Sequence, residues 1–107
     1  KALPDTTLLE LDESRVAAGA ATFDRFCVNC HGAGAVGGGV VPDLRYSSTI
    51  LSLDTWNAIL SHGALKDRGM VAYSEELSED DIQSIREYII ERNQQARAEG
   101  KVIKYGL

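Results

Sequence analysis

The feature that constrains this chain most is the five-residue run Cys27-Val28-Asn29-Cys30-His31. Two thiols three positions apart on a helical turn share one face, so both sulfurs can reach the vinyl groups along one edge of a porphyrin. The imidazole of His31 can then bind the iron from one side. This run is the attachment signature of a c-type haem, and it predicts one covalent haem per chain bound by Cys27, Cys30 and His31.

Three other interpretations of the same thiols remain open. A zinc site would need a second pair of ligands, but the chain has two cysteines in all and one further histidine, His62. A thioredoxin-like dithiol would need a βαβ setting, and no strand pattern leads into Cys27. A disulfide between Cys27 and Cys30 would close too short a loop to stabilise much. Haem attachment is favoured over all three.

Length and composition indicate one small domain. A chain of 107 residues has a marginal core by itself, and a covalent haem would supply apolar volume that the chain lacks. No apolar run approaches the roughly 18–20 residues needed to span a bilayer, so no transmembrane segment is expected. The net charge of −5 argues against nucleic acid as a partner.

The start of the chain bears on where the protein works. It opens with Lys1 and shows no apolar stretch behind a charged start, so no signal peptide is visible. Covalent haem attachment of this type is expected outside the cytoplasm. We therefore expect an exported, periplasmic protein and interpret Lys1 as the start of a mature chain or a fragment.

A first helix is predicted to begin after Asp12, which has the side chain of a good N-cap. Apolar residues follow at helical spacing and place Phe23 on the same stripe as Cys27. Gly19 lies one turn before Phe23, where a glycine costs about 1 kcal/mol relative to alanine. A close approach by another helix would explain its use.

Two further helices complete a predicted all-α fold. Ser52 is expected to cap the second helix, and Gly63 to end it. Ser78 and Asp81 form a capping-box-like pair at the start of the third, and Gly100 is expected to close it.

The resulting domain organisation has three parts. Residues 1–11 are predicted to be an N-terminal tail or linker that packs through Leu8 and Leu9. Residues 12–100 form the domain, and residues 101–107 a C-terminal tail. The sequence between residues 32 and 37 matches G-x-G-x-x-G, but no strand precedes it. It is interpreted as a loop beside a flat cofactor.

The second axial ligand of a haem iron would come from Met70 or His62. Met70 is the one methionine of the chain and lies in a predicted loop after Gly69, which allows close backbone approach. A thioether prefers ferrous iron, so ligation by His31 and Met70 would raise the reduction potential relative to two imidazoles. It would also leave no open position for oxygen. We therefore expect an electron carrier and not an enzyme.

Two other function classes stay in view. A haem enzyme or gas sensor would need an open distal site, with Met70 away from the iron. A haem-free structural module would lack the cofactor altogether.

The residues resemble those of class I cytochromes c. The resemblance rests on Gly19, Phe23, the Cys27–His31 run, the Met70 loop and Tyr88 of the last helix. It implies a class I cytochrome c fold in which Gly19 and Phe23 pack across Tyr88.

A narrower resemblance concerns residues 41–48 and 63–70. Both stretches resemble the cytochrome domain fused to the C-terminal end of quinohaemoprotein alcohol dehydrogenases. This implies a dehydrogenase with pyrroloquinoline quinone (PQQ) as electron donor, and another cytochrome or a terminal oxidase as acceptor. The propeller and the quinone-binding residues of those enzymes are missing, so the chain is either such a domain or a free cytochrome of the same lineage.

The same resemblance implies further contacts to the haem. Pro42 would offer its carbonyl to His31. One or more of three side chains would meet the haem propionates: Arg45, Tyr46 and Trp56. A guanidinium can pair with a carboxylate through two N–H groups, and a buried indole N–H needs an acceptor. A solvated Arg45 and a Trp56 that merely fills the core are the alternatives.

Overall fold

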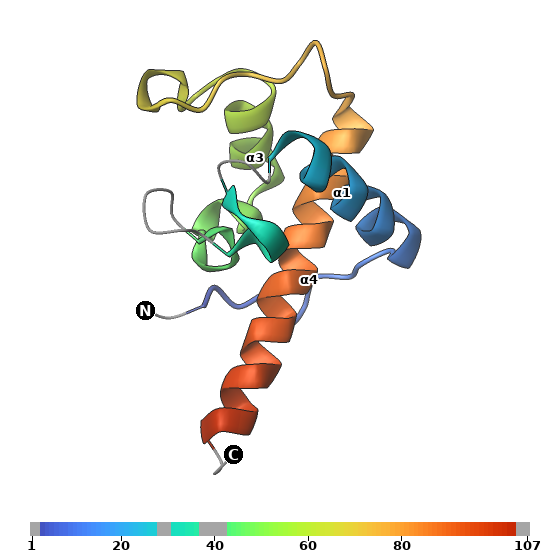
Figure 1. Cartoon of the computed structure of the whole chain (residues 1–107), viewed down its shortest axis with the longest axis vertical. Helices are drawn as coiled ribbons and strands as arrows, with labels where there is room; N and C mark the ends of the chain where they lie inside the picture. The colour runs from blue at the N-terminus through green and yellow to red at the C-terminus, as the bar shows by residue number, and fades with distance from the viewer. Residues whose placement is uncertain (1–2, 28–30, 37–42, 105–107) are drawn as a thin grey trace.

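The computed structural model describes residues 3–27, 31–36 and 43–104, with only the backbone for residue 33 and residues 100–104. This part of the chain contains no strand. Its three α-helices are α1 (Glu13–Phe26), α3 (Leu53–Leu60) and α4 (Glu79–Lys104) (Figure 1). Its 3-10 turns are η1 (Ala33–Ala35), η2 (Leu44–Tyr46), η3 (Ser48–Leu51) and η4 (Lys66–Arg68). The predicted all-α architecture with three main helices is confirmed.

All three helices begin where the sequence predicted, because the starting signals are local. The Asp12 side chain accepts hydrogen bonds from two backbone N–H groups in the first turn of α1. Ser52 accepts one from the N–H of Thr55 at the start of α3. Ser78 and Asp81 cap each other's backbone N–H groups, at 3.0 and 3.1 Å. Each cap satisfies donors that would otherwise have no partner at a helix N-terminus.

Gly63 lies shortly after the second helix as predicted, whereas the predicted end of the third helix is wrong. Helix α1 stops at Phe26, and Cys27 caps it. Helix α3 stops at Leu60, and Gly63 adopts a φ of 71° in the turn that follows. Helix α4 continues through Gly100, so the prediction that this glycine closes the helix is wrong. A glycine ends a helix by adopting the left-handed conformation, and Gly100 remains helical.

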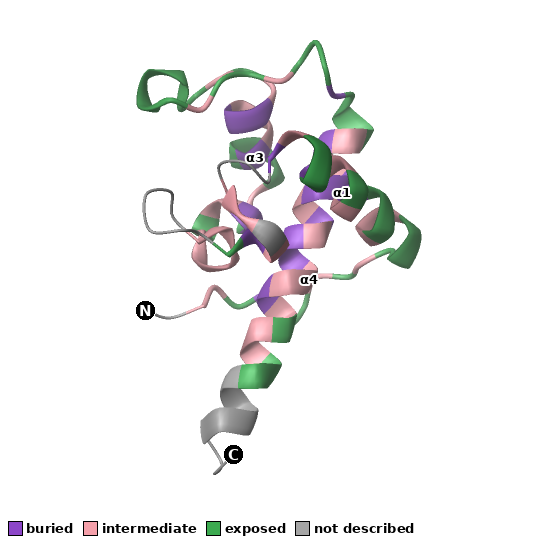
Figure 2. Ribbon diagram, in the orientation of Figure 1, coloured by how far each residue is buried: buried purple, intermediate pink, exposed green. Residues whose placement is uncertain are grey.

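Helices α1 and α4 cross at Gly19, as the resemblance implied. A Cβ atom on Gly19 would lie 1.9 Å from the carbonyl oxygen of Ser84, so no larger residue fits. One turn further on, the rings of Phe23 and Tyr88 are 5.4 Å apart between centroids and inclined at 52°. Figure 2 shows buried positions on both helices in this region. The crossing fixes the end of α1, which carries Cys27.

The N-terminal segment lies against α4 without regular structure. Leu9 packs on the core as expected, whereas Leu8 is 96% exposed and the expectation for it is wrong. Thr6 is completely buried instead. Its hydroxyl donates to the side chain of Asn93 on α4 at 2.7 Å, so a polar contact positions the segment together with Leu9.

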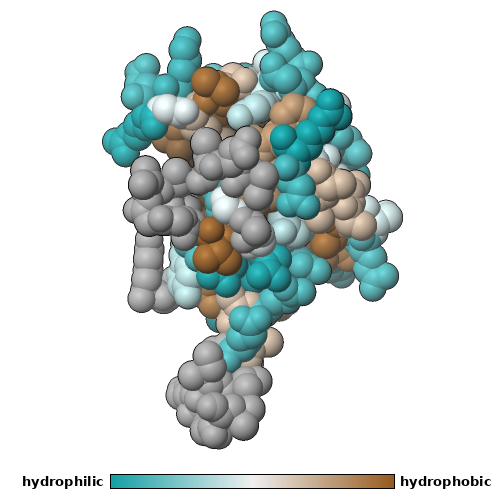
Figure 3. Space-filling model, viewed as in Figure 1, coloured by the Kyte–Doolittle hydropathy of each residue, from teal (hydrophilic) through white to brown (hydrophobic). Residues whose placement is uncertain are grey.

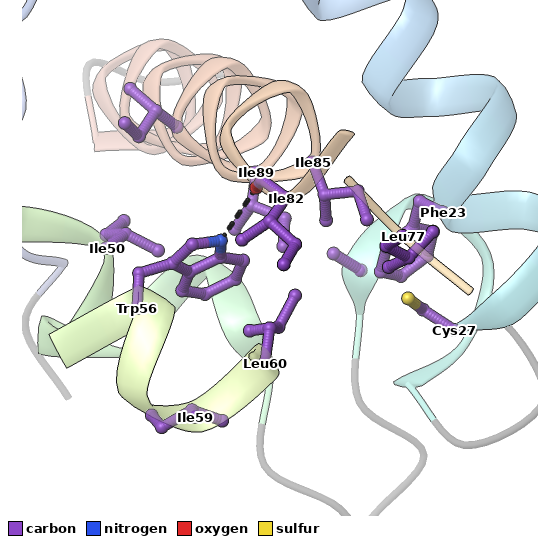
Figure 4. Close-up of a cluster of buried hydrophobic side chains, with 12 residues drawn as sticks. Phe23, Cys27, Ile50, Trp56, Ile59, Leu60, Leu77, Ile82, Ile85 and Ile89 are labelled. Carbon is purple, nitrogen blue, oxygen red and sulfur yellow. Dashed lines mark hydrogen bonds between the residues drawn. The ribbon is translucent and has the colours of Figure 1, made fainter. Parts of the chain in front are cut away.

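The hydrophobic core lies between the three helices (Figure 4). Helix α4 contributes three isoleucines at helical spacing, Ile82, Ile85 and Ile89, all at most 1% exposed. Figure 4 shows the sulfur of Cys27 directed toward this cluster. Within the described residues, no helix combines the length and the apolar character that crossing a membrane requires.

Candidate haem site

An apolar cavity of about 140 Å³ opens between the end of α1, helix α3 and helix α4. Its lining residues are Phe23, Cys27, His31, Leu44, Ser47, Thr49, Trp56, Ile59, Leu60, Leu65, Met70, Ile85 and Ile89. Cys27, His31 and Met70, three of the predicted cofactor ligands, thus border one space. Ligand sites typically enclose about 300–1,000 Å³, so a porphyrin bound here would extend beyond the enclosed volume.

Backbone hydrogen bonds at the end of α1 hold the residues of the first thiol and of the imidazole. The Cys27 N–H donates to the carbonyl of Phe23 at 2.8 Å, and the His31 N–H donates to the carbonyl of Cys27 at 2.9 Å. Cys27 is 8% exposed. Cys30 lies outside the described residues, so its placement stays a prediction. His31 and Cys27 both line the same cavity.

The surroundings of His31 favour the form of the imidazole that binds a metal. Burial lowers the pKa of His31, which favours the neutral ring. Its Nδ1 atom is buried and has no hydrogen-bond partner among the described residues. A haem-ligating histidine binds iron through one ring nitrogen and donates the other N–H to an acceptor. Pro42, the expected acceptor, lies outside the described residues.

Met70 reaches the cavity from a loop between α3 and α4. Its N–H donates to the carbonyl of Leu65 at 3.2 Å, and Gly69 before it has a φ of 96°, which favours glycine. Tyr73 returns the loop to α3 by donating its N–H to the carbonyl of Leu60. Met70 is half-buried and packs on the core. His62, the alternative ligand, is exposed and lies outside the cavity lining.

Arg45 and Tyr46 lie beside the cavity, in η2, and are not part of its lining. The guanidinium of Arg45 binds both carboxylate oxygens of Asp43, at 3.0 and 2.7 Å. These bonds hold the pKa of Asp43 below its usual 3.8. The same guanidinium lies 5.8 Å from the centre of the Tyr46 ring. The expected contact of Arg45 and Tyr46 with propionates stays a prediction.

Trp56 lines the cavity with its ring while its polar edge faces α4. Its Nε1–H donates to the carbonyl of Ile82 at 2.9 Å, as Figure 4 shows, and the residue is 3% exposed. This bond uses the N–H that the resemblance assigned to a propionate. The contribution of Trp56 to the cavity in this structure is therefore its apolar ring face.

Three polar residues of α4 that sequence reasoning missed each bind one of the turns around the cavity. Arg92 donates to the carbonyl of Gly34 in η1 at 3.1 Å, and Arg86 donates to that of Ile50 in η3 at 2.8 Å. Asn93 donates to the carbonyl of η2 at 2.9 Å. Arg86 and Asn93 lie two helical turns apart, so they project from one side of the helix. This spacing is the one feature of the sequence that could have pointed to their contacts with the turns.

The turn that follows His31 has an unusual backbone. Gly34 and Ala35 have φ values of 68° and 65°. A positive φ is uncommon for a residue with a Cβ atom, yet Ala35 is completely buried. The bond from Arg92 to Gly34 stabilises this conformation directly after the imidazole.

An apolar cavity bordered by a thiol, an imidazole and a thioether fits a haem held in a helical fold, the arrangement of a c-type cytochrome domain. The chain belongs to the cytochrome c family, since residues 14–89 match the family model described as cytochrome c oxidase, cbb3-type, subunit III. The family implies a covalently bound haem c. The predicted cofactor and the class I cytochrome c fold are confirmed.

Comparisons with individual proteins agree with the narrower resemblance. The chain is 34% identical to the quinohemoprotein alcohol dehydrogenase ADH-IIG of Pseudomonas putida over 101 residues, 94% of this chain and 14% of that protein. The solved structure of ADHIIG from Pseudomonas putida HK5 superposes with a TM-score of 0.84 at 31% identity, covering 97% of this chain and 15% of that one.

A smaller relative also matches. Cytochrome c550 of Pseudomonas aeruginosa is 32% identical over 74 residues, which are 66% of this chain and 51% of that protein. By contrast, the chain spans only 11–14% of the length of the alcohol dehydrogenases that it matches. The chain is thus related to the cytochrome domains of these enzymes, which implies a role in electron transfer.

Proposed function

We propose that this chain transfers single electrons through a haem c whose iron is bound by His31 on one face and by Met70 on the other. The observation that carries this proposal is that both side chains line one apolar cavity next to Cys27, whereas His62 is exposed outside it. When bound, the haem supplies an iron that alternates between the ferric and the ferrous state.

The residues of the chain have distinct tasks in this function. The hydrophobic lining from α3 and α4 excludes water from the cofactor. The thioether of Met70 favours ferrous iron and raises the reduction potential relative to a second imidazole. Ligands on both faces leave no position for oxygen or peroxide, so the chain acts as an electron carrier and not by itself as an enzyme.

The electron donor that we propose is a PQQ-dependent alcohol dehydrogenase, either as the rest of the same protein or as a separate partner. Support comes from the match to the quinohemoprotein alcohol dehydrogenases named above, each of which is far longer than this chain. The acceptor would be a further cytochrome or a terminal oxidase, in the periplasm.

Partner contacts are expected to be brief and to use small apolar areas near the site. Val36 follows η1, and Leu65 and Val71 flank the Met70 loop; their exposures are 41%, 37% and 54%. On the face drawn in Figure 3, hydrophobic side chains of the described residues form small separate areas in a mostly hydrophilic surface. Such small contacts suit a transient electron-transfer complex.

The ligand assignment is tested by Met70→Ala, with His62→Ala as the matched control. Met70→Ala is expected to lower the reduction potential and to let the ferrous protein bind carbon monoxide, because it removes the thioether. His62→Ala is expected to leave both unchanged. The measurements are the optical spectra of the ferric protein with cyanide and of the ferrous protein with carbon monoxide, and a redox titration.

The outcomes separate the proposal from its rivals. If the spectrum is unchanged in Met70→Ala and changed in His62→Ala, the second iron ligand is His62 and not Met70. Rapid binding of carbon monoxide by the unmodified protein would support a haem enzyme or gas sensor. An intact mass without haem would support a structural module. The donor is tested by rapid mixing with a reduced PQQ-dependent alcohol dehydrogenase, which should reduce the haem.

A further inference from the structure

Asn93 is a completely buried amide on α4 whose hydrogen bonds reach two other segments. Its Nδ2 group donates to the carbonyls of Arg45 at 2.9 Å and of Pro4 at 3.1 Å. Its Oδ1 atom accepts from the hydroxyl of Thr6 at 2.7 Å. Both N–H groups and the oxygen of the amide are therefore used, as a buried polar group requires.

One of these partners belongs to the wall of the cavity. Arg45 is the middle residue of η2, its neighbour Leu44 lines the cavity, and Ser47 directly after η2 lines it as well. Inside the turn, the N–H groups of Tyr46 and Ser47 donate to carbonyls three residues earlier, each at 3.1 Å. The bond from Asn93 connects the backbone of this turn to α4.

The other partners belong to the N-terminal segment, residues 3–9. Thr6 is completely buried, which is unusual for this residue type. Gln94 donates to the carbonyl of Thr6 at 3.2 Å, and Arg97 donates to that of Pro4 at 2.6 Å. Removing one of these groups would leave a buried partner without a hydrogen bond, which is costly.

We propose that Asn93 is a positioning residue of the haem site, and that the N-terminal segment keeps its amide in the orientation that positions η2. The Thr6 hydroxyl and the Pro4 carbonyl fix the two ends of the amide. One Nδ2 hydrogen then points to Arg45, so Leu44 and Ser47 are placed at the cavity. This inference rests on the proposed function, because its consequence is a change at the haem.

The test compares Thr6→Val with Thr7→Val in the haem-loaded full chain. Valine has the shape of threonine without the hydroxyl, so Thr6→Val leaves Oδ1 of Asn93 without its donor. Thr7 is exposed, and its hydroxyl binds only Asp5 among the described residues. The measurements are amide hydrogen exchange of Tyr46 and Ser47 and the reduction potential.

Thr6→Val is expected to accelerate exchange of the Tyr46 and Ser47 amides about tenfold, the effect of losing one typical hydrogen bond, and to shift the reduction potential. Thr7→Val should match the unmodified protein in both. Thr6→Ser, which restores the hydroxyl, should return both values. A lower melting temperature of Thr6→Val with exchange in η2 and potential unchanged would overturn the proposal, because Asn93 would then be merely structural.

A second variant decides the question if Thr6→Val yields no haem-loaded protein. Gln94→Ala removes one bond to the segment and leaves Asn93 intact. Faster exchange of the Tyr46 and Ser47 amides in Gln94→Ala would support the proposal, and unchanged exchange would overturn it. Failure of the proposed function is distinguishable, since it appears in the spectrum of the unmodified protein before any variant is compared.

Discussion

Gly19 shows how much one residue decides in this fold. Two helices approach so closely there that the backbone of α4 occupies the space of a side chain on α1. In the sequence, Gly19 stands out because a glycine inside a helix is less stable than an alanine. The crossing explains its presence, since a larger residue would overlap the backbone of α4. The same approach places Phe23 against Tyr88 and fixes Cys27 at the cavity.

Gly19→Ala is expected to destabilise the folded protein, although alanine is the better helix former by about 1 kcal/mol. The added methyl group would overlap the carbonyl of Ser84, and relief by separating the helices costs about 1–3 kcal/mol as overpacking. Urea unfolding of the haem-loaded protein measures the change. Ala18→Gly, on the exposed side of α1, is the control, with an expected loss of about 1 kcal/mol. A Gly19→Ala protein as stable as the unmodified one would contradict the close crossing.

At the scale of elements, the short turns around the cavity depend on α4. Each of η1, η2 and η3 has one carbonyl bound by a polar side chain of that helix. Turn η1 needs this contact most, because Gly34 and Ala35 both have positive φ values. Because η1 follows His31 closely in the chain, a change in its backbone would also displace the proposed iron ligand.

Arg92→Leu is expected to lower the free energy of unfolding by about 1.5–3 kcal/mol, the usual contribution of a hydrogen bond from a charged group. Exchange of the Ala35 amide, which donates to the Gly32 carbonyl at 3.1 Å, should accelerate at the same time. Arg25→Leu, an exposed arginine of α1, is the control. Equal losses in both variants would mean that Arg92 acts only through its charge.

Elements with local signals could be predicted from the sequence, whereas polar contacts between distant residues could not. Asp12, Ser52 and Ser78 were recognised as caps because each binds N–H groups within three residues of itself. The bond between Thr6 and Asn93 joins residues 87 positions apart, and no periodicity reports it.

The candidate site divides in the same way. The attachment run and the single methionine pointed to the cofactor by their chemistry alone. The bond from the Trp56 indole to Ile82 depends on how α3 packs on α4, so the sequence could show that the buried N–H needs an acceptor but not which acceptor it binds.

The whole molecule is arranged around α4, which contacts α1, α3 and the turns η1, η2 and η3. Figure 1 shows this helix running along most of the longest axis of the structure. Charged pairs at several places add to the apolar contacts. Arg15 of α1 binds Asp80 and Glu87 of α4, at 2.9 and 3.5 Å, and Asp43 binds Arg45 beside the cavity. Stability of the whole should therefore depend on carboxylates remaining charged.

Three aspartates, Asp5, Asp12 and Asp43, have a lowered pKa in the folded protein, and the last two lie in the helical part of the chain. Hydrogen bonds from Arg45 lower the pKa of Asp43, and a hydrogen bond from Ser14 is the main cause of the lowered pKa of Asp12. A group with a lowered pKa in the folded state binds fewer protons there than in the unfolded chain. Its contribution to the free energy of unfolding is complete above the ordinary pKa of 3.8 and is lost as the pH falls through the lower pKa of the folded state.

The haem-loaded protein is thus expected to lose stability as the pH falls below about 4, and less steeply in the double variant Asp12→Asn, Asp43→Asn. Asparagine is as good an N-cap as aspartate, so α1 keeps its start without a titrating group. Urea unfolding at several values between pH 3 and pH 7 measures the slope. Asp24→Asn, on the exposed side of α1, is a control for lost charge. If the double variant declines as steeply as this control, these two carboxylates do not set the acid limit, and the contacts of Arg15 with α4 become the next site to test.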